Sequence, residues 1–338
     1  MIVKNEAHVI QRCLRSVRPF IDSYSISDTG STDNTLDLIR EELAGLPGVL
    51  MCDPWLGYGP SRNVALSRSS GSHILWLDAD EVFVNAGGPL ELPAEVDYFE
   101  IMQIATGFSV WQRRIIRNVE GWRWQGMVHE VLVFDGVSKG MMLNNIQIRG
   151  LYDSHQNIVG NKYLDYLDIL KGEAPTPRNV FYHASTLFEL ERYEEAIAKY
   201  DERVAMGGWE EEVYYSLWKI GECKRYLSRP FQETAGALFA AYVYRPSRFE
   251  ALASLCSILG QNKRWQESYQ LSARSVSPPG DALFVMPSAE WRVLEEHALA
   301  AFYLGKKEEA REYFQRVAQY DLDPTDKARI KTNLSYCT

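Results

Sequence analysis

Two aspartates, Asp78 and Asp80, stand two residues apart directly after a short apolar run at 73–77. If that run is a strand, both carboxylates emerge at the carboxyl edge of a sheet, which is where open α/β sheets bind ligands. Paired carboxylates at such an edge suit a hard divalent cation, which commonly bridges to phosphate oxygens. Acids also cap helices and occupy turns, so this pair alone leaves a purely structural role open.

Further polar residues fall at equivalent places earlier in the chain. Asn5 and Glu6 follow a strand stub at 2–3, and Asp28 follows a strand predicted at 24–27. Because these strands are expected in one sheet, the three side chains line the same edge as the aspartate pair. For Glu6 the alternative is an acid at a helix N-terminus that complements the helix dipole.

The first 155 residues or so alternate short apolar runs with helical patterns. Strands are predicted at 2–3, 24–27, 49–51 and 73–77, with helices between them. Strands that alternate with helices indicate an α/β fold whose sheet is mostly parallel and covered on both faces. The later apolar runs lack helices between them and predict an antiparallel addition; they cover 98–104, 114–117, 131–134 and 146–148.

From about Asn179 the strand signals end and a helical repeat begins. Its recurring small residues are assigned to Ala196, Ala235, Ser268 and Ala310. The pattern resembles the tetratricopeptide repeat, a helical pair of about 34 residues; a generic helical bundle is the alternative. We therefore expect a domain over 1–160, a helical linker over 161–178 and a tetratricopeptide-like repeat domain over 179–338.

Composition excludes several classes of protein. The 45 acidic and 36 basic side chains give a net charge of −9, and 46% of residues are hydrophobic, as in folded soluble chains. There is no basic surplus for nucleic-acid binding and no apolar stretch of the 18 or more residues that an integral membrane segment requires. Five widely spaced cysteines, with no signal-peptide pattern at the start, favour the cytoplasm.

An ordered set of motifs carries a family resemblance. The motifs are Met1-Ile2-Val3-Lys4-Asn5-Glu6, Asp28-Thr29-Gly30-Ser31-Thr32-Asp33-Asn34-Thr35, Arg62-Asn63, Asp78-Ala79-Asp80-Glu81 and Val128-His129-Glu130, with His155 beyond them. The set resembles family 2 glycosyltransferases with the GT-A fold, a Rossmann-like mixed sheet, and is most similar to the lipopolysaccharide-core glucosyltransferase branch. Such domains usually have apolar residues before the first motif, so we expect either a trimmed first strand or a true start upstream.

The resemblance implies an inverting, metal-dependent transferase that moves a hexose from a nucleotide sugar. UDP-glucose or UDP-N-acetylglucosamine is the expected donor, and Mn²⁺ or Mg²⁺ the expected cofactor. The acceptor is expected to be a hydroxyl or thiol of a protein, peptide or surface glycan, because the architecture is also similar to peptide S-glycosyltransferases that carry helical repeats. The repeats are also able to support a homodimer.

The resemblance also assigns roles to the residues at the sheet edge. Asp80 is expected to bind the metal, and Asp78 the ribose or the metal shell. Arg62 is expected near the diphosphate, where a guanidinium fits phosphate oxygens, or else in a surface ion pair. His155 is the expected second metal ligand, with His129 as its rival and as a further catalytic candidate. By analogy, the polar residues Asn5, Glu6 and Asp28 hold uracil and ribose.

Glycosyl transfer also needs a base for the proton of the acceptor, and a desolvated carboxylate within hydrogen-bond reach can serve. Glu130 is the candidate, since it ends the aromatic stretch 122–130, in which Trp124 is a possible sugar-stacking platform. The alternative makes the tryptophans core residues and Glu130 part of an ion pair. Glu81 and Asp97 are rival bases.

Two other functions compete with transfer. A non-catalytic scaffold would use the repeats to bind a partner beside an inert GT-A domain. A nucleotidyltransferase would require a glycine-rich, basic phosphate loop after the first strand, and the residues at 4–8 contain no glycine.

Overall fold

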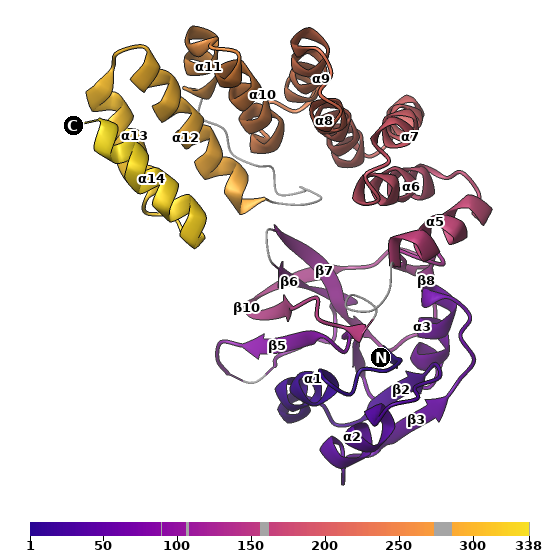
Figure 1. Cartoon of the computed structure of the whole chain (residues 1–338). Helices are drawn as coiled ribbons and strands as arrows, with labels where there is room; N and C mark the ends of the chain where they lie inside the picture. The colour runs from indigo at the N-terminus through magenta and orange to yellow at the C-terminus, as the bar shows by residue number, and fades with distance from the viewer. Residues whose placement is uncertain (89, 106–107, 156–161, 274–285, 338) are drawn as a thin grey trace. The chain divides into compact units, whose positions relative to one another are not determined.

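The computed structural model describes residues 1–88, 90–105, 108–155, 162–273 and 286–337. The chain divides into two compact units, Met1–Gly172 and Glu173–Thr338. The first unit combines strands and helices, and the second is built of helices (Figure 1). The α/β fold followed by helical repeats that the sequence predicts is confirmed at this level.

A three-stranded parallel sheet opens the first unit, with strand order β1-β2-β3. Its strands are β1 (Ile2–Val3), β2 (Tyr24–Asp28) and β3 (Gly48–Cys52). The helices that follow these strands are α1 (Ile10–Val17), α2 (Thr35–Glu42) and α3 (Tyr58–Ser67), with a short 3₁₀ helix at Arg18–Phe20. Parallel strands need such crossovers because their ends lie at opposite edges of the sheet.

A five-stranded sheet follows, with strand order β4-β7-β6-β10-β5. Its strands are β4 (His73–Leu75), β5 (Glu81–Asn85), β6 (Tyr98–Ala105), β7 (Phe108–Arg117) and β10 (Gly140–Gly150). All neighbours pair antiparallel except β6 and β10, which are parallel. A separate hairpin joins β8 (Trp122–Gln125) to β9 (Val131–Phe134), and helix α5 (Lys162–Gly172) ends the unit.

The strand expected at 73–77 differs from the prediction in two ways. It ends at Leu75, and it pairs antiparallel with β7 instead of extending the parallel sheet. Fewer strands are therefore paired in parallel than the alternation of strands and helices suggests. Strands β5 and β8 were not among the predicted elements.

Helix α1 joins the cores of the two sheets. Ile10 and Leu14 pack with residues of the parallel sheet, whereas Cys13 and Val17 pack with residues of the five-stranded sheet. Ala79 is 5% exposed and belongs to the first of these clusters. Burial of Ala79 fixes the turn after β4 and leaves its two neighbours, Asp78 and Asp80, half-buried beside the parallel sheet.

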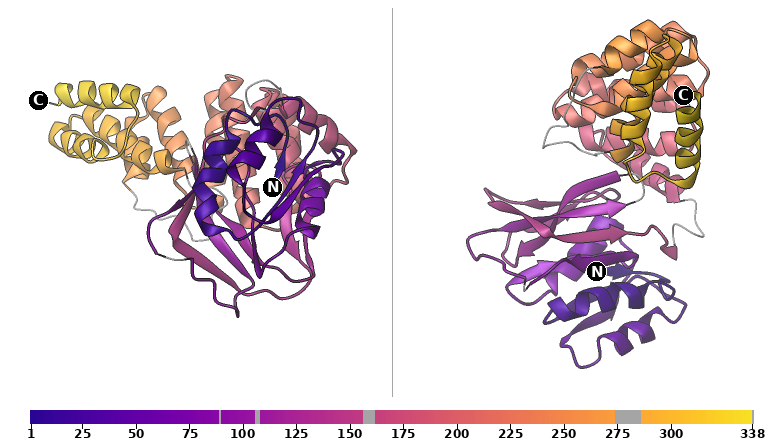
Figure 2. Two further views of the ribbon diagram at one scale, coloured as in Figure 1. Left: turned by 90° about the horizontal axis from the view of Figure 1, so that it is seen from below. Right: turned by 90° about the vertical axis from the view of Figure 1, so that its left-hand side faces the viewer.

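The second unit is a series of helix pairs that follow one another along a curved row (Figures 1 and 2). The pairs are α6 (Pro177–Glu189) with α7 (Tyr193–Met206), α8 (Glu210–Tyr226) with α9 (Phe231–Tyr244), α10 (Phe249–Gln261) with α11 (Trp265–Ser272), and α12 (Pro287–Tyr303) with α13 (Lys307–Val317), followed by α14 (Pro324–Tyr336). Each helix packs on its partner and on the next pair, as in a helical solenoid.

The repeat register corrects one predicted position. Ala196, Ser268 and Ala310 are all fully buried near the start of the second helix of their pairs. In α9 the equivalent residue is Thr234, which is fully buried, while Ala235 is half-buried. Helix register, and not residue size, decides which side chain meets the neighbouring helix.

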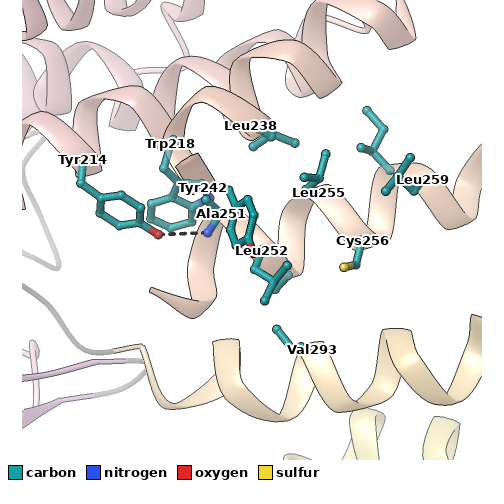
Figure 3. Packing of buried hydrophobic residues seen from close by; sticks show 13 residues of the cluster. Tyr214, Trp218, Leu238, Tyr242, Ala251, Leu252, Leu255, Cys256, Leu259 and Val293 are labelled. Carbon is teal, nitrogen blue, oxygen red and sulfur yellow. Dashed lines mark hydrogen bonds between the residues drawn. The ribbon is translucent and has the colours of Figure 1, made fainter. Parts of the chain in front are cut away.

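The core of the second unit is continuous across several pairs. Figure 3 shows Trp218, Leu238, Leu255 and other apolar side chains of α8, α9 and α10 packed together, with Val293 of α12 against them. The Tyr214 hydroxyl accepts a hydrogen bond from the Ala251 N–H at 3.1 Å. Among the described residues, no helix has the length and apolar character needed to cross a membrane.

Candidate functional site

The loops after β1 and β2 are bonded to each other. Asn5, at φ 58°, accepts a hydrogen bond from the Thr32 N–H at 2.7 Å and donates its own N–H to Ser31 at 2.9 Å. The Glu6 N–H donates to the hydroxyl of Thr35 at 2.8 Å. The residues of the 28–35 motif therefore hold the polar residues after β1 at the sheet edge.

Asp28 is 2% exposed and carries an acceptor atom that the fold does not use. Its Oδ2 accepts the N–H groups of Gly30 (3.1 Å) and Ser31 (3.0 Å). Its Oδ1 is buried and has no hydrogen-bond partner within the described part of the chain. Because an unsatisfied buried acceptor is costly, this atom is suited to receive an N–H or O–H from a ligand.

Arg62 of α3 is the centre of the charged cluster. Its Nη2 lies 2.7 Å from Asp78 Oδ1, and its Nε lies 2.5 Å from Glu130 Oε1. The guanidinium also lies over the rings of Trp76 and Trp124, at 5.3 and 5.1 Å from their centroids. Burial opposes the charge of Asp78, but Arg62 and then Arg114 hold the pKa of that carboxyl below its usual range.

Helix α3 is held to the segment that carries Glu130 by hydrogen bonds of Asn63 and by a close approach at Gly59. The Asn63 side chain donates to the Trp124 carbonyl at 2.9 Å and accepts the Trp124 N–H at 2.7 Å, so it continues the strand as a backbone would. A Cβ atom on Gly59 would lie 2.2 Å from the carbonyl oxygen of Gly126. The Arg62-Asn63 motif thus combines a charged group with the side chain that positions its helix.

Trp124 does not have the open position expected of a sugar platform. Its side chain is 7% exposed and packs edge-on against Trp76, with ring centroids 4.8 Å apart. It belongs to a core cluster with Ile116 and Leu132. Pairing of β8 with β9 turns this residue inward, which matches the core alternative for the tryptophans.

A loop at 151–155 brings His155 to the sheet edge. The His155 N–H donates to Glu6 Oε2 at 3.2 Å, and Asp153 forms two hydrogen bonds with the Arg12 guanidinium at 2.7 and 2.9 Å. The backbone of Ser154 bonds the carboxylate of Asp80. Glu6, Asp80 and His155 are therefore neighbours although up to 149 residues separate them.

Two carboxyl groups at this edge have raised pKa values. Burial raises the pKa of Glu6 to about 7. The hydrogen bond from the His155 N–H lowers this pKa, whereas the negative charge of Asp80 raises it further. Burial and then the charge of Asp78 raise the pKa of Asp80. Raised carboxyl pKa values of this origin are those that a bound cation would reverse.

Asp80 is the candidate carboxylate for an ion that would be shared with a ligand. Among the described residues, no group of three or more His, Cys, Asp or Glu side chains is arranged to hold a metal ion. Mg²⁺ commonly takes only one or two protein carboxylates and completes its shell with phosphate oxygens and water. The half-buried Asp80 can supply such a carboxylate.

The rival bases have structural partners. Glu81 is 2% exposed, forms a bidentate ion pair with Arg114 at 2.7 and 2.8 Å, and accepts the Asp78 N–H at 2.9 Å. Asp97 pairs with Arg117 at 2.7 Å. Arg114 therefore positions the aspartate pair through Glu81. Arg114 was not among the residues selected from the sequence, although a charged residue among apolar neighbours in a predicted strand was a signal of a buried ion pair.

His129 faces an aromatic group that was also not predicted. Its backbone has φ 50°, and its ring lies edge-on to Tyr166 of α5 with centroids 5.2 Å apart. Tyr166 also contacts the ring of Tyr58, which in turn contacts Trp55. Of the residues selected from the sequence, Arg62, Asp78 and Glu130 form one cluster and Glu6, Asp80 and His155 a second.

Comparisons with known proteins bear on this site. Residues 1–85 match the family model for glycosyl transferase family 2. A TPR repeat-containing protein of Synechococcus elongatus is 32% identical over 141 residues, which is 39% of this chain and 34% of that protein. An uncharacterized glycosyltransferase of Rickettsia typhi is 25% identical over 190 residues, 55% of this chain and 59% of the relative.

The SPbeta prophage-derived glycosyltransferase SunS of Bacillus subtilis is 23% identical over 214 residues, 58% of this chain and 50% of SunS. The chain thus spans between about a third and three fifths of the length of these three relatives. A solved tetratricopeptide repeat protein from Parabacteroides merdae covers 52% of this chain and 66% of its own, with a TM-score of 0.40 and 11% identity. The match to glycosyl transferase family 2 thus lies in the first unit, and tetratricopeptide-like helical repeats make up the second.

Proposed function

We propose that this protein is an inverting, metal-dependent glycosyltransferase that transfers a hexose from a nucleotide sugar. The observation that carries the proposal is the ion-paired cluster of Arg62, Asp78 and Glu130, two of whose members lie within the family 2 match. UDP-glucose or UDP-N-acetylglucosamine is the proposed donor. The proposed acceptor is a hydroxyl or thiol of a protein, peptide or glycan.

The donor is proposed to lie along the loops after β1 and β2. Asp28 Oδ1, buried and without a partner in the described residues, accepts an N–H or O–H from the base or ribose. Asn5 keeps these loops together through Thr32 and borders the same site. Asp78 contacts the ribose or the metal shell, and Arg62 contributes positive charge toward the diphosphate.

Asp80 is the proposed metal ligand, and His155 is proposed to complete the shell from the loop that Glu6 anchors. When bound, Mn²⁺ or Mg²⁺ neutralises charge on the leaving diphosphate. Because Asp80 is half-buried, its carboxylate is less solvated than a surface acid and gains more from a cation.

Transfer is proposed to occur in one displacement. The acceptor oxygen or sulfur bonds to the anomeric carbon, the bond from that carbon to the diphosphate oxygen breaks, and the nucleoside diphosphate leaves. The acceptor proton passes to the carboxylate of Glu130, whose side chain is 10% exposed and is held by Arg62. His129 orients the acceptor beside this carboxylate. Attack from the face opposite the leaving group inverts the anomeric centre.

The helical unit is proposed to select the acceptor or to bind a second copy of the chain, because solenoid surfaces present extended binding faces. The cytoplasm is the proposed compartment. All five cysteines are free, which suits a reducing environment.

A cysteine at the sheet edge gives a direct test of donor binding. Cys52 is exposed, the other four cysteines are buried, and Cys52 aligns with Asp28 on the neighbouring strand. UDP-glucose with Mn²⁺ should raise the melting temperature and slow alkylation of Cys52 by N-ethylmaleimide. A scaffold with an inert domain predicts neither effect, and a flat response to both UDP-sugars would reject the proposed function.

A further inference from the structure

A row of aromatic side chains begins at the protein surface and ends beside Glu130. Trp55 is 44% exposed and lies edge-on to Tyr58, with centroids 4.8 Å apart. Tyr58 lies edge-on to Tyr166 at 5.8 Å, and Tyr166 lies edge-on to His129 at 5.2 Å. His129 precedes Glu130 in the chain. We call Trp55, Tyr58, Tyr166 and His129 the aromatic wall.

The wall is held by contacts that do not involve a ligand. The Tyr58 N–H donates to the Met127 carbonyl at 3.0 Å, so the start of α3 is bonded to the segment before His129. Gly57, at φ 100°, makes the turn between Trp55 and Tyr58. The Tyr166 hydroxyl donates to the Tyr58 hydroxyl at 3.5 Å. The rings are therefore preorganised, which lowers the entropy cost of binding.

The inner end of the wall is close to the proposed base. Burial raises the pKa of Tyr166, and the Tyr58 hydroxyl and the Glu130 carboxylate add to that rise because a tyrosinate there would be repelled. Glu130 is in turn bonded to Arg62. A molecule lying along the wall would therefore end near this carboxylate, which shares Arg62 with Asp78.

The chemistry of the wall suits a sugar ring. Aromatic faces cover apolar C–H surface, while indole, phenol and imidazole rings are polar at their edges. A pyranose has the same division, with C–H groups on its faces and hydroxyls around its rim.

We propose that the aromatic wall is an acceptor subsite that binds a pyranose ring, with Trp55 stacking on it and a hydroxyl directed to Glu130. This inference rests on the proposed function, because it names the acceptor class for that reaction. It makes Trp55 a specificity-determining residue for the acceptor.

The test uses the full chain and saturation-transfer-difference NMR with methyl β-D-glucopyranoside, in the presence and absence of UDP and Mn²⁺. Trp55→Ala should lower the affinity for the glucoside about fivefold or more, and Trp55→Phe should recover part of it. Trp209→Ala is the matched control, because Trp209 is 46% exposed and lies in the other unit; it should leave the affinity unchanged.

Three results would overturn the wall as a sugar subsite: no glucoside binding to the wild-type chain, equal binding to Trp55→Ala, or saturation transfer to a Gly-Ser-Cys-Gly peptide in place of the glucoside. Donor binding is read separately, by protection of Cys52. If UDP fails to protect Cys52 while the glucoside binds through Trp55, the proposed function fails and the subsite stands.

Discussion

Removal of the Arg62 cation tests the charged cluster most sharply. In Arg62→Met, a side chain of similar length keeps much of the packing against Trp76 and Trp124 but leaves Asp78 and Glu130 without their shared partner. The two carboxylates then stand as neighbouring negative charges, and we expect the β4 and β8 regions to open more readily.

The exposure of the partners sets the size of the effect. Arg62 and Glu130 are each 10% exposed, so their pair counts as buried, and breaking a buried pair costs ~3–5 kcal/mol. Asp78 is 37% exposed, so solvent screening reduces its share to ~1 kcal/mol or less. Repulsion is relieved if one carboxylate takes up a proton, so we expect ~3–4 kcal/mol in total.

Hydrogen exchange followed by mass spectrometry separates the two units and reads the opening free energy of the β4 and β8 peptides. A loss of ~3 kcal/mol corresponds to exchange roughly a hundredfold faster. The control is Arg123→Met on β8, whose pair with Asp135 is 48% and 65% exposed and is worth ~0–1 kcal/mol. If Arg62→Met changes exchange no more than Arg123→Met, Arg62 does not organise the cluster.

Three further perturbations probe other contacts. Asn63→Ala removes both hydrogen bonds to the Trp124 backbone and should lower the opening free energy of β8 by ~1–3 kcal/mol in the same exchange experiment. Asn118→Ala is the control, because the hydrogen bonds of Asn118 to the Ser69 and Gly71 carbonyls are exposed, and it should not change the opening of β8. Gly59→Ala places a Cβ 2.2 Å from the Gly126 carbonyl oxygen and should separate α3 from that turn. We expect a lower melting temperature, and we expect that the donor no longer protects Cys52 from alkylation. A variant with the melting temperature and Cys52 protection of the wild type would contradict the close approach of α3 and Gly126. Burial raises the pKa of Glu296 to about 7, so the folded state binds the extra proton and the helical unit loses stability as pH rises from about 4.5 to 7. Glu296→Gln should flatten this decline in melting temperature, and an unchanged slope would exclude Glu296 as its source.

Much of the fold could be predicted because local patterns carry it. Asp33 and Thr35 follow β2 as turn and cap chemistry, and α2 begins at Thr35. The apolar spacing of Ile10, Leu14 and Val17 matches the buried face of α1. The repeat was visible from small residues at the start of each second helix, although Thr234 shows that residue size alone does not fix the register.

The parts that sequence reasoning missed depend on tertiary pairing. Strand β4 was expected to extend the parallel sheet, but its partner β7 begins 33 residues after β4 ends. The sequence left Trp124 either as a sugar-stacking platform or as a core residue, and the pairing of β8 with β9 buries it. The two ion-pair partners of Arg62 lie 16 and 68 positions from it in the sequence. No spacing rule predicts ion pairs at such separations.

The proposed function requires Asp80 to hold a cation that interacts with the diphosphate of a nucleotide-sugar donor. Titration calorimetry of UDP into the wild-type chain and into Asp80→Ala, each with Mn²⁺ and with chelator, measures it directly. We expect UDP to bind the wild type tightly only with Mn²⁺ and Asp80→Ala to lose this dependence. Equal UDP affinity in all four titrations would contradict it.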